Sequence, residues 1–230
     1  MKAVFAFFMG LLLTAHSLVA QKADRTKPPV SEAPRGLIVP KVEQFTLKNG
    51  VKVYYLQKTG VPHVSITVRS NGGTANDPEA KIGLATATAM LMNDGAGNRN
   101  ALELSDEIDY LGIILQSYAS TDEMSVGLFT PVSRLDASLD LMRDVVLKPR
   151  FEATEWQRRQ RESLVALAQA HDEARVIAST AFNQLIYGKS HPFARRASES
   201  TLKNISIADI QGFYRQTITA ANSSFLVVGD

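Results

Sequence analysis

Residues 83–95 read GLATATAMLMNDG, and the rest of the chain can be understood from this stretch outward. Asp77-Pro78-Glu79 upstream suits the first turn of a helix, and Gly95 suits the position just after a helix end. Three strand-like runs precede the stretch, and the turn Ser70–Gly73 leads into it. This is the setting of a catalytic helix, yet Thr and Ala stand where groups that ligate a metal or move a proton are expected.

The apolar patterning predicts strands on both sides of this helix. Strands are expected at 42–47, 51–57, 64–69, 113–119, 123–130 and 224–230. Asn49-Gly50 between the first two runs is a strong hairpin signal. Helices are expected at 83–94, 98–111, 135–147, at 152–187 with an interruption near 171–175, and in a short segment opened by Ser206. The order β-β-β-α-α-β-β-α-α-α-β predicts an α+β fold with helices packed on one face of a mainly antiparallel sheet.

The first twenty residues predict a secretory signal peptide. Lys2 supplies a positive start, residues 4–13 form an apolar run, and the small residues Ala15, Ser17 and Ala20 follow. The run is shorter than the roughly 20 apolar residues that a membrane-spanning helix needs. A buried N-terminal helix is the alternative, and it fits this order of charge and apolar residues less well. We therefore expect a secreted or periplasmic protein, cleaved after Ser17 or Ala20.

The composition limits the remaining possibilities. The 230 residues, 45% of them apolar, suffice for one large domain or two small ones with a real core. The 25 basic and 23 acidic residues are interspersed, so no basic patch indicates nucleic-acid binding. Cysteine is absent, which excludes disulfides and a lipid anchor through Cys. Residues 21–40 are polar and proline-rich and predict an N-terminal arm, which leaves 41–230 as the folded domain.

No set of reactive side chains has the spacing of a familiar catalytic site. The chain has four histidines, and no two of them lie four residues apart on one expected helix. Residues 171–173 (His-Asp-Glu) are consecutive and would point in different directions from a helix. His191, before Pro192, suits loop packing, and the acidic residues 106–109 suit the solvated side of an amphipathic helix. Without Cys or a Gly-x-Ser-x-Gly segment, nucleophilic catalysis is not indicated.

Seven segments, in order over residues 42–230, resemble the N-terminal half-domain of the M16 metalloproteases (insulinase, pitrilysin and mitochondrial processing peptidase). They are 47–53 (LKNGVKV), 71–78 (NGGTANDP), 83–85 (GLA), 111–112 (LG), 119–121 (AST), 186–193 (IYGKSHPF) and 226–230 (LVVGD). The resemblance implies an α+β half-domain with an M16/LuxS-like metallohydrolase fold, which normally pairs with a similar one. We therefore expect the sequence to stop before a second half-domain.

The resemblance also implies where a zinc site would be. In active members His-x-x-Glu-His follows Gly-Leu-Ala; the two His bind zinc and the Glu is the general base. Here Thr86 and Met90 occupy the His positions and Ala89 the Glu position. The third ligand, a Glu on a later helix, would fall near Ala166 or Leu167, and residues 163–170 contain no acid. Since Thr is a poor zinc ligand and the Met thioether is too soft, we expect no catalytic residue, metal ligand or cofactor. We expect Thr86, Ala89 and Met90 to be packing residues in a vacated zinc site.

These replacements predict a non-catalytic subunit or half that completes the peptide-binding chamber of an active zinc-peptidase partner in the periplasm. Zinc would then be held only by the partner, and this chain would contact the peptide substrate through the shared chamber. Two alternatives remain: a structural scaffold of the same fold, and the N-terminal part of a longer protease whose zinc motif lies beyond residue 230. We expect no nucleic-acid partner and no membrane contact after signal cleavage. Arg158, Arg159 and Arg161 are expected to meet water.

Overall fold

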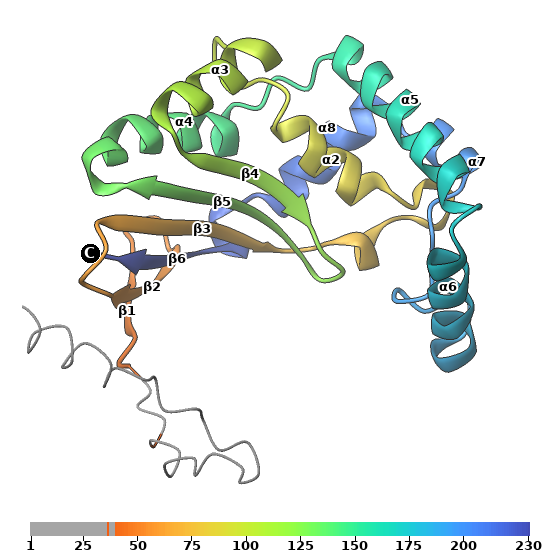
Figure 1. Ribbon diagram of the computed structural model, residues 1–230, viewed down its shortest axis with the longest axis horizontal. Helices are drawn as coiled ribbons and strands as arrows, with labels where there is room; N and C mark the ends of the chain where they lie inside the picture. The colour runs from red at the N-terminus through yellow and green to blue at the C-terminus, as the bar shows by residue number, and fades with distance from the viewer. Residues whose placement is uncertain (1–35, 37–39) are drawn as a thin grey trace, which may run out of the picture. The chain divides into compact units, whose positions relative to one another are not determined.

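The computed structural model describes Gly36 and residues 40–230 of the chain (Figure 1). The predicted signal peptide (1–20) and nearly all of the predicted arm (21–40) lie outside the described residues. In the described part, no helix is long and apolar enough to cross a membrane. Residues 40–230 form a layer of helices over one face of a six-stranded sheet, so the predicted α+β class is confirmed.

The sheet is mainly antiparallel, as predicted, with one parallel pair. Its strands are β1 (Glu43–Thr46), β2 (Lys52–Gln57), β3 (His63–Asn71), β4 (Ile114–Ala119), β5 (Glu123–Pro131) and β6 (Ser223–Gly229). They lie in the order β1-β2-β6-β3-β5-β4. The last strand, β6, therefore lies between β2, to which it is parallel, and β3, to which it is antiparallel. β1 and β4 are the two edges of the sheet.

The hairpin of β1 and β2 contains the predicted Asn-Gly, but its loop is longer than a two-residue turn. The Leu47 N–H donates to the Val51 carbonyl at 2.9 Å, and the Gly50 N–H donates to the Leu47 carbonyl at 2.9 Å. Gly50 has a φ of 87°, the left-handed conformation that glycine adopts without steric cost. The loop is thus Lys48–Gly50, the three-residue type in which a left-handed residue precedes the second strand.

The described residues form seven α-helices, and six of them follow the predicted patterns closely. They are α2 (Leu84–Met92), α3 (Ala101–Leu111), α4 (Leu135–Leu147), α5 (Ala153–Ala170), α6 (Ala174–Tyr187), α7 (Glu199–Lys203) and α8 (Ile207–Thr217). The predicted interruption near 171–175 is the break between α5 and α6. α7 was not predicted, since a single turn capped by Ser198 leaves little apolar periodicity in the sequence.

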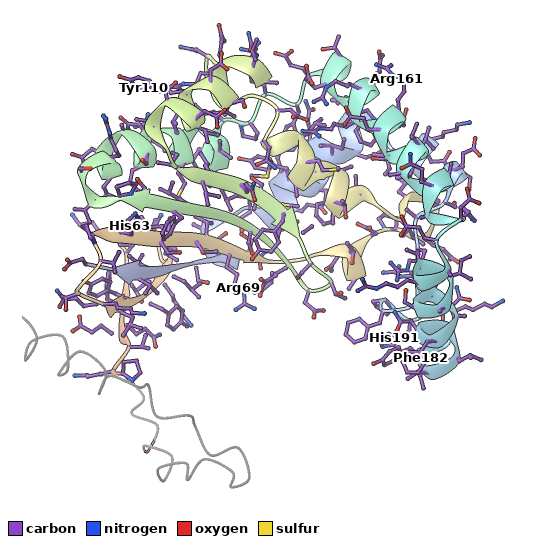
Figure 2. All side chains as sticks on the ribbon, in the orientation of Figure 1. His63, Arg69, Tyr110, Arg161, Phe182 and His191 are labelled. Carbon is purple, nitrogen blue, oxygen red and sulfur yellow. The ribbon has the colours of Figure 1, made fainter. Side chains whose placement is uncertain are left out.

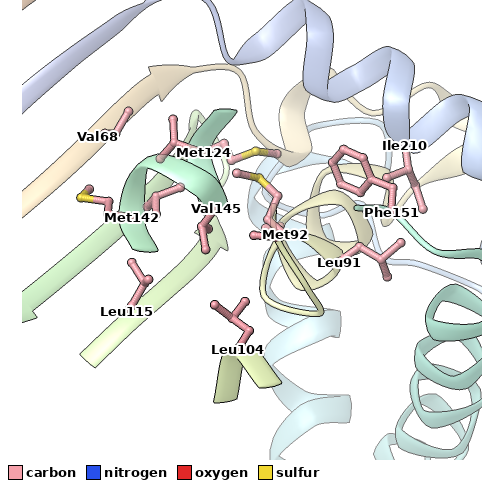
Figure 3. Packing of buried hydrophobic residues seen from close by; sticks show 14 of the residues in the cluster. Val68, Leu91, Met92, Leu104, Leu115, Met124, Met142, Val145, Phe151 and Ile210 are labelled. Atoms are coloured by element: carbon pink, nitrogen blue, oxygen red, sulfur yellow. The ribbon is translucent and has the colours of Figure 1, made fainter. Parts of the chain in front are cut away.

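The core lies between the sheet and the helices, with α2 at its centre. Leu91 and Met92 on α2 are fully buried. Figure 3 shows them among core residues from β3, β4, β5, α3, α4 and α8: Val68, Leu115, Met124, Leu104, Met142, Val145 and Ile210. α2 is therefore fixed by apolar packing on the sheet side, and polar contacts fix its two ends.

Candidate functional site

The amino end of α2 is held by a buried carboxylate that precedes the helix. Asp77 Oδ2 accepts a hydrogen bond from the Gly83 N–H, and Oδ1 accepts one from the Ala85 N–H, both at 2.8 Å. Burial raises the pKa of Asp77, and these two bonds and the charge of Arg195 offset part of that rise. The predicted helix start at residues 77–79 is wrong, because Gly83 at a φ of 108° separates a short 3-10 turn from α2.

Arg195, in the loop after α6, fixes the turn that carries Asp77. Its guanidinium donates to three backbone carbonyls: Asp77 at 3.1 Å, Thr74 at 3.0 Å and Ala75 at 2.7 Å. A guanidinium has five donors in a rigid plane, which suits several carbonyls of one turn. No sequence pattern indicates this role, because the partners are main-chain atoms more than a hundred residues away.

The carboxyl end of α2 is tied to α5 by a buried ion pair. The Asp94 side chain is only 5% exposed, and Arg159 binds it through Nε–Oδ2 and Nη2–Oδ1 contacts of 2.6 Å each. Arg158 adds a contact of 3.3 Å from Nη2 to Oδ1. Hydrogen bonding to Asp94 raises the pKa of Arg159. The expectation that Arg158 and Arg159 meet only water is wrong, whereas Arg161 is exposed as expected (Figure 2).

A third polar link joins the turn before α2 to α8, which packs against α2. Lys81 Nζ lies 2.6 Å from Asp209 Oδ1. Asp209 Oδ2 also accepts hydrogen bonds from the Ser206 N–H at 2.9 Å and the Ser206 hydroxyl at 2.6 Å. Burial alone would raise the pKa of Asp209, but the hydrogen bonds from Lys81 and Ser206 outweigh it and lower the pKa to about 2.

This link predicts a defined loss of stability in acid. The folded pKa of Asp209 lies below the ordinary value of 3.8, so its contribution is present above that value and is lost as the pH falls toward about 2. In urea unfolding between pH 5 and pH 2, wild type should therefore lose more free energy of unfolding than Asp209→Asn. Lys81→Met removes the cation but leaves the Ser206 hydrogen bonds, so it should reproduce only part of that difference. Equal pH dependence in wild type and Asp209→Asn would contradict the assignment.

The three positions at which the resemblance places zinc chemistry lie on α2 but differ in environment. Ala89 is buried in the core, Met90 is half-buried and Thr86 is exposed. The packing interpretation thus fits Ala89 and is wrong for Thr86, because the helix turns residue 86 away from the sheet. On α5, Ala166 is exposed, and Leu167 is half-buried against the core.

The residues present do not fit the zinc that the resemblance implies. Around the face formed by Thr86 and Met90, the donors are a single hydroxyl and a thioether, which hydrolytic zinc sites do not use. Among the described residues, no group of three or more His, Asp or Glu side chains is placed to hold a metal ion. What the arrangement does provide is a set of contacts that position α2 and α5 relative to each other.

The other side chains considered as reactive candidates either make packing or ion-pair contacts or are exposed to solvent. His191 stacks on Tyr187, with ring centroids 5.1 Å apart, and meets Phe193 edge-on, so it packs in its loop as predicted. Glu107 binds Arg99, whereas Asp106 and Asp109 are exposed on α3. His171, between α5 and α6, is exposed.

Comparison with known proteins shows the family. The sequence model of the insulinase family, peptidase family M16, matches residues 52–191. Since this match spans well over half of the chain, the chain belongs to peptidase family M16. The resemblance carried by the seven segments is confirmed.

Three relatives illustrate how much of a larger protein this chain corresponds to. A peptidase M16 inactive domain from Pseudomonas fluorescens has a similar fold, with a TM-score of 0.76 and 23% identity over 83% of this chain and 47% of that one. A protease from Helicobacter pylori gives a TM-score of 0.74 and 22% identity over 84% and 47%. Cytochrome b-c1 complex subunit 1, mitochondrial, from Caenorhabditis elegans is 26% identical over 115 residues, or 50% of this chain and 24% of that protein. The chain thus spans less than half the length of each.

Proposed function

We propose that the chain is a non-catalytic M16 half or subunit that completes the peptide-binding chamber of an active zinc-peptidase partner. Its family membership and a donor set that does not fit zinc support this proposal. The likeness to a solved domain described as inactive also favours it. The signal-like first twenty residues favour the periplasm as the place where the two proteins meet.

The observation that carries the pairing is the exposure of α6. This helix has 14 residues and none is buried, although five of its large hydrophobic side chains are exposed: Ile177, Phe182, Leu185, Ile186 and Tyr187. Leu185 is 85% exposed. Figure 1 shows α6 extending beyond the end of α5 and away from the helical layer, and Figure 2 shows Phe182 on it. A helix of this length is marginal in water by itself, and exposed apolar patches mark interfaces.

A second M16-type half is the partner that fits this surface. The match covers 47% of each of two solved relatives, so the rest of each of those chains is about as long again as the part that matches. For this chain, a second half of that length would belong either to a separate subunit or to a longer form of the same chain. In both cases α6 would be covered by the other half.

A scaffold role is the second candidate function, and the match to the C. elegans cytochrome b-c1 subunit favours it. A scaffold would also need α6 for assembly, but it would leave the peptidase activity of its partner unchanged. The two functions therefore differ in an activity measurement and not in binding.

The test is to co-express the chain with an M16 protein that carries His-x-x-Glu-His and is encoded beside it. We expect the two to co-purify, peptide cleavage to require both, and the chain alone to hold less than about one-tenth of an equivalent of zinc. Phe182→Asp with Leu185→Asp should abolish co-purification. Tyr110→Asp, at a residue 79% exposed on α3, should not.

Each part of the proposal has a result that would overturn it. Peptide cleavage at the same rate with and without this chain would contradict the chamber role. If the two proteins nevertheless co-purified, the scaffold role would be the function that fits. Stoichiometric zinc in the isolated chain would contradict the view that it has no metal site. Co-purification that survives the α6 substitutions would exclude α6 as the interface.

A further inference from the structure

β4 is an edge strand of the sheet. The backbone groups of one of its residues, on the side away from β5, are already hydrogen-bonded to a side chain. In an antiparallel pair, alternate residues turn both backbone groups away from the neighbouring strand. Ser117, opposite Val126 of β5, is such a residue. The Asn93 side chain binds both of its groups: Oδ1 accepts from the Ser117 N–H at 2.7 Å, and Nδ2 donates to the Ser117 carbonyl at 3.0 Å.

The Asn93 carboxamide reproduces what a peptide group of an additional strand would offer. It has one carbonyl acceptor and N–H donors, as a main-chain amide does, and it uses both kinds on a single residue. Its position is fixed by α2, because Nδ2 also lies 3.2 Å from the Ala89 carbonyl. Ala89 stands at the position of the family's general base, so the contact lies directly beside the vacated site.

An ordinary helix cap does not account for this geometry. Asn93 follows the last residue of α2 with φ −86° and ψ −8°, which is right-handed, and not the left-handed conformation in which Asn ends helices. Its two bonds to Ser117 reach a residue 24 positions away, on the sheet. The side chain therefore serves the strand edge as well as its own helix.

We propose that Asn93 is a built-in cap on β4 that closes this edge to extended peptides. Free strand edges take up extended chains through main-chain hydrogen bonds. A peptide running along β4 past α2 would need the N–H and carbonyl of Ser117, and both are taken. Ser117 is also only 7% exposed, so a peptide would have to displace Asn93 to reach it. This inference goes beyond the proposed pairing, since it concerns which surface of this chain peptide can use.

Amide hydrogen exchange on the whole chain tests the cap without any ligand. We expect the Ser117 amide of wild type to be protected although it faces a sheet edge. Asn93→Ala should speed its exchange about fivefold, the factor that corresponds to one hydrogen bond of typical net strength, about 1 kcal/mol. The matched control is Asn204→Ala, which removes another Asn side-chain bond to a backbone carbonyl, that of Ala80, and should leave Ser117 unchanged. Unprotected exchange of Ser117 in wild type would overturn the proposal even if the variant did not fold.

A binding experiment tests the closure itself. The probe is an acetylated peptide with the sequence of residues 123–131, the strand that β4 already accepts on its other side. In NMR titrations it should shift the amide resonances of Leu115, Ser117 and Ala119 in Asn93→Ala and leave them in place in wild type and Asn204→Ala. Equal shifts in wild type and Asn93→Ala, or none in Asn93→Ala, would overturn the closure.

Discussion

Replacing Arg159 with alanine is expected to lower the free energy of unfolding by about 3–5 kcal/mol, since removing one partner of a buried pair leaves the other charge uncompensated. The charge left behind is that of Asp94, which is 5% exposed and receives two bonds of 2.6 Å from Arg159. Arg158 stays within 3.3 Å of Asp94 and should keep the loss near the lower end of that range. Urea unfolding followed by circular dichroism measures the change.

Two further variants make the result specific to the pair. Arg159→Lys keeps the charge but loses the two-point geometry, so its loss should be intermediate. Arg161→Ala, at an exposed position on the same helix, should stay within about 0.5 kcal/mol of wild type. If Arg159→Ala were as stable as Arg161→Ala, the ion pair would not be what ties α5 to α2.

Gly73→Ala is expected to destabilise the fold by more than about 4 kcal/mol, or to prevent folding, which places it among the exceptional single substitutions. A Cβ at residue 73 would lie 2.2 Å from the Ser120 carbonyl oxygen, 2.6 Å from that of Thr121 and 2.7 Å from the Glu123 nitrogen. All three are main-chain atoms of the β4–β5 turn, so no side-chain rotation can relieve the contact. The bonds of 2.9 and 2.8 Å from the Thr74 and Ala75 N–H groups to the same turn would be lost.

Gly212→Ala provides a control of opposite sign. Nothing lies within 4 Å of a Cβ at residue 212, which is inside α8, so alanine should raise the free energy of unfolding by about 0.5–1 kcal/mol. Thermal unfolding of both variants against wild type measures the contrast. A Gly73→Ala protein with the stability of wild type would show that the two turns can separate freely.

The helices and strands could be predicted from local patterns, but the contacts between distant elements could not. Alternation predicted β3 and β5, and the amphipathic pattern at 98–111 predicted α3. Ser70–Gly73 was interpreted as a plain turn, because the close approach of Gly73 to Ser120 depends on a strand pair that no local pattern contains. The ion pair of Asp94 was missed for the same reason: an Arg-rich helix segment has the same sequence whether it faces water or a buried carboxylate.

The candidate site was accessible to sequence only through the family resemblance. That comparison identified Thr86, Ala89 and Met90, and no periodicity would have marked three such ordinary residues. It could not show that Thr86 is exposed, since exposure depends on how α2 rotates against the sheet. Asn93 carried no signal, because an Asn near a helix end is common and its contact with Ser117 requires the folded edge.

The place of β6 has a consequence for how the chain folds. Among the strands of the described residues, β6 alone joins the β1–β2 hairpin to the rest of the sheet, and it is the last strand along the chain. Its pairing with β2 has a very large sequence separation, and such non-local contacts slow folding because loop-closure entropy must be overcome first. Until residues 223–229 arrive, the hairpin and β3 each present an unpaired edge. Such exposed edges make incomplete chains prone to aggregation.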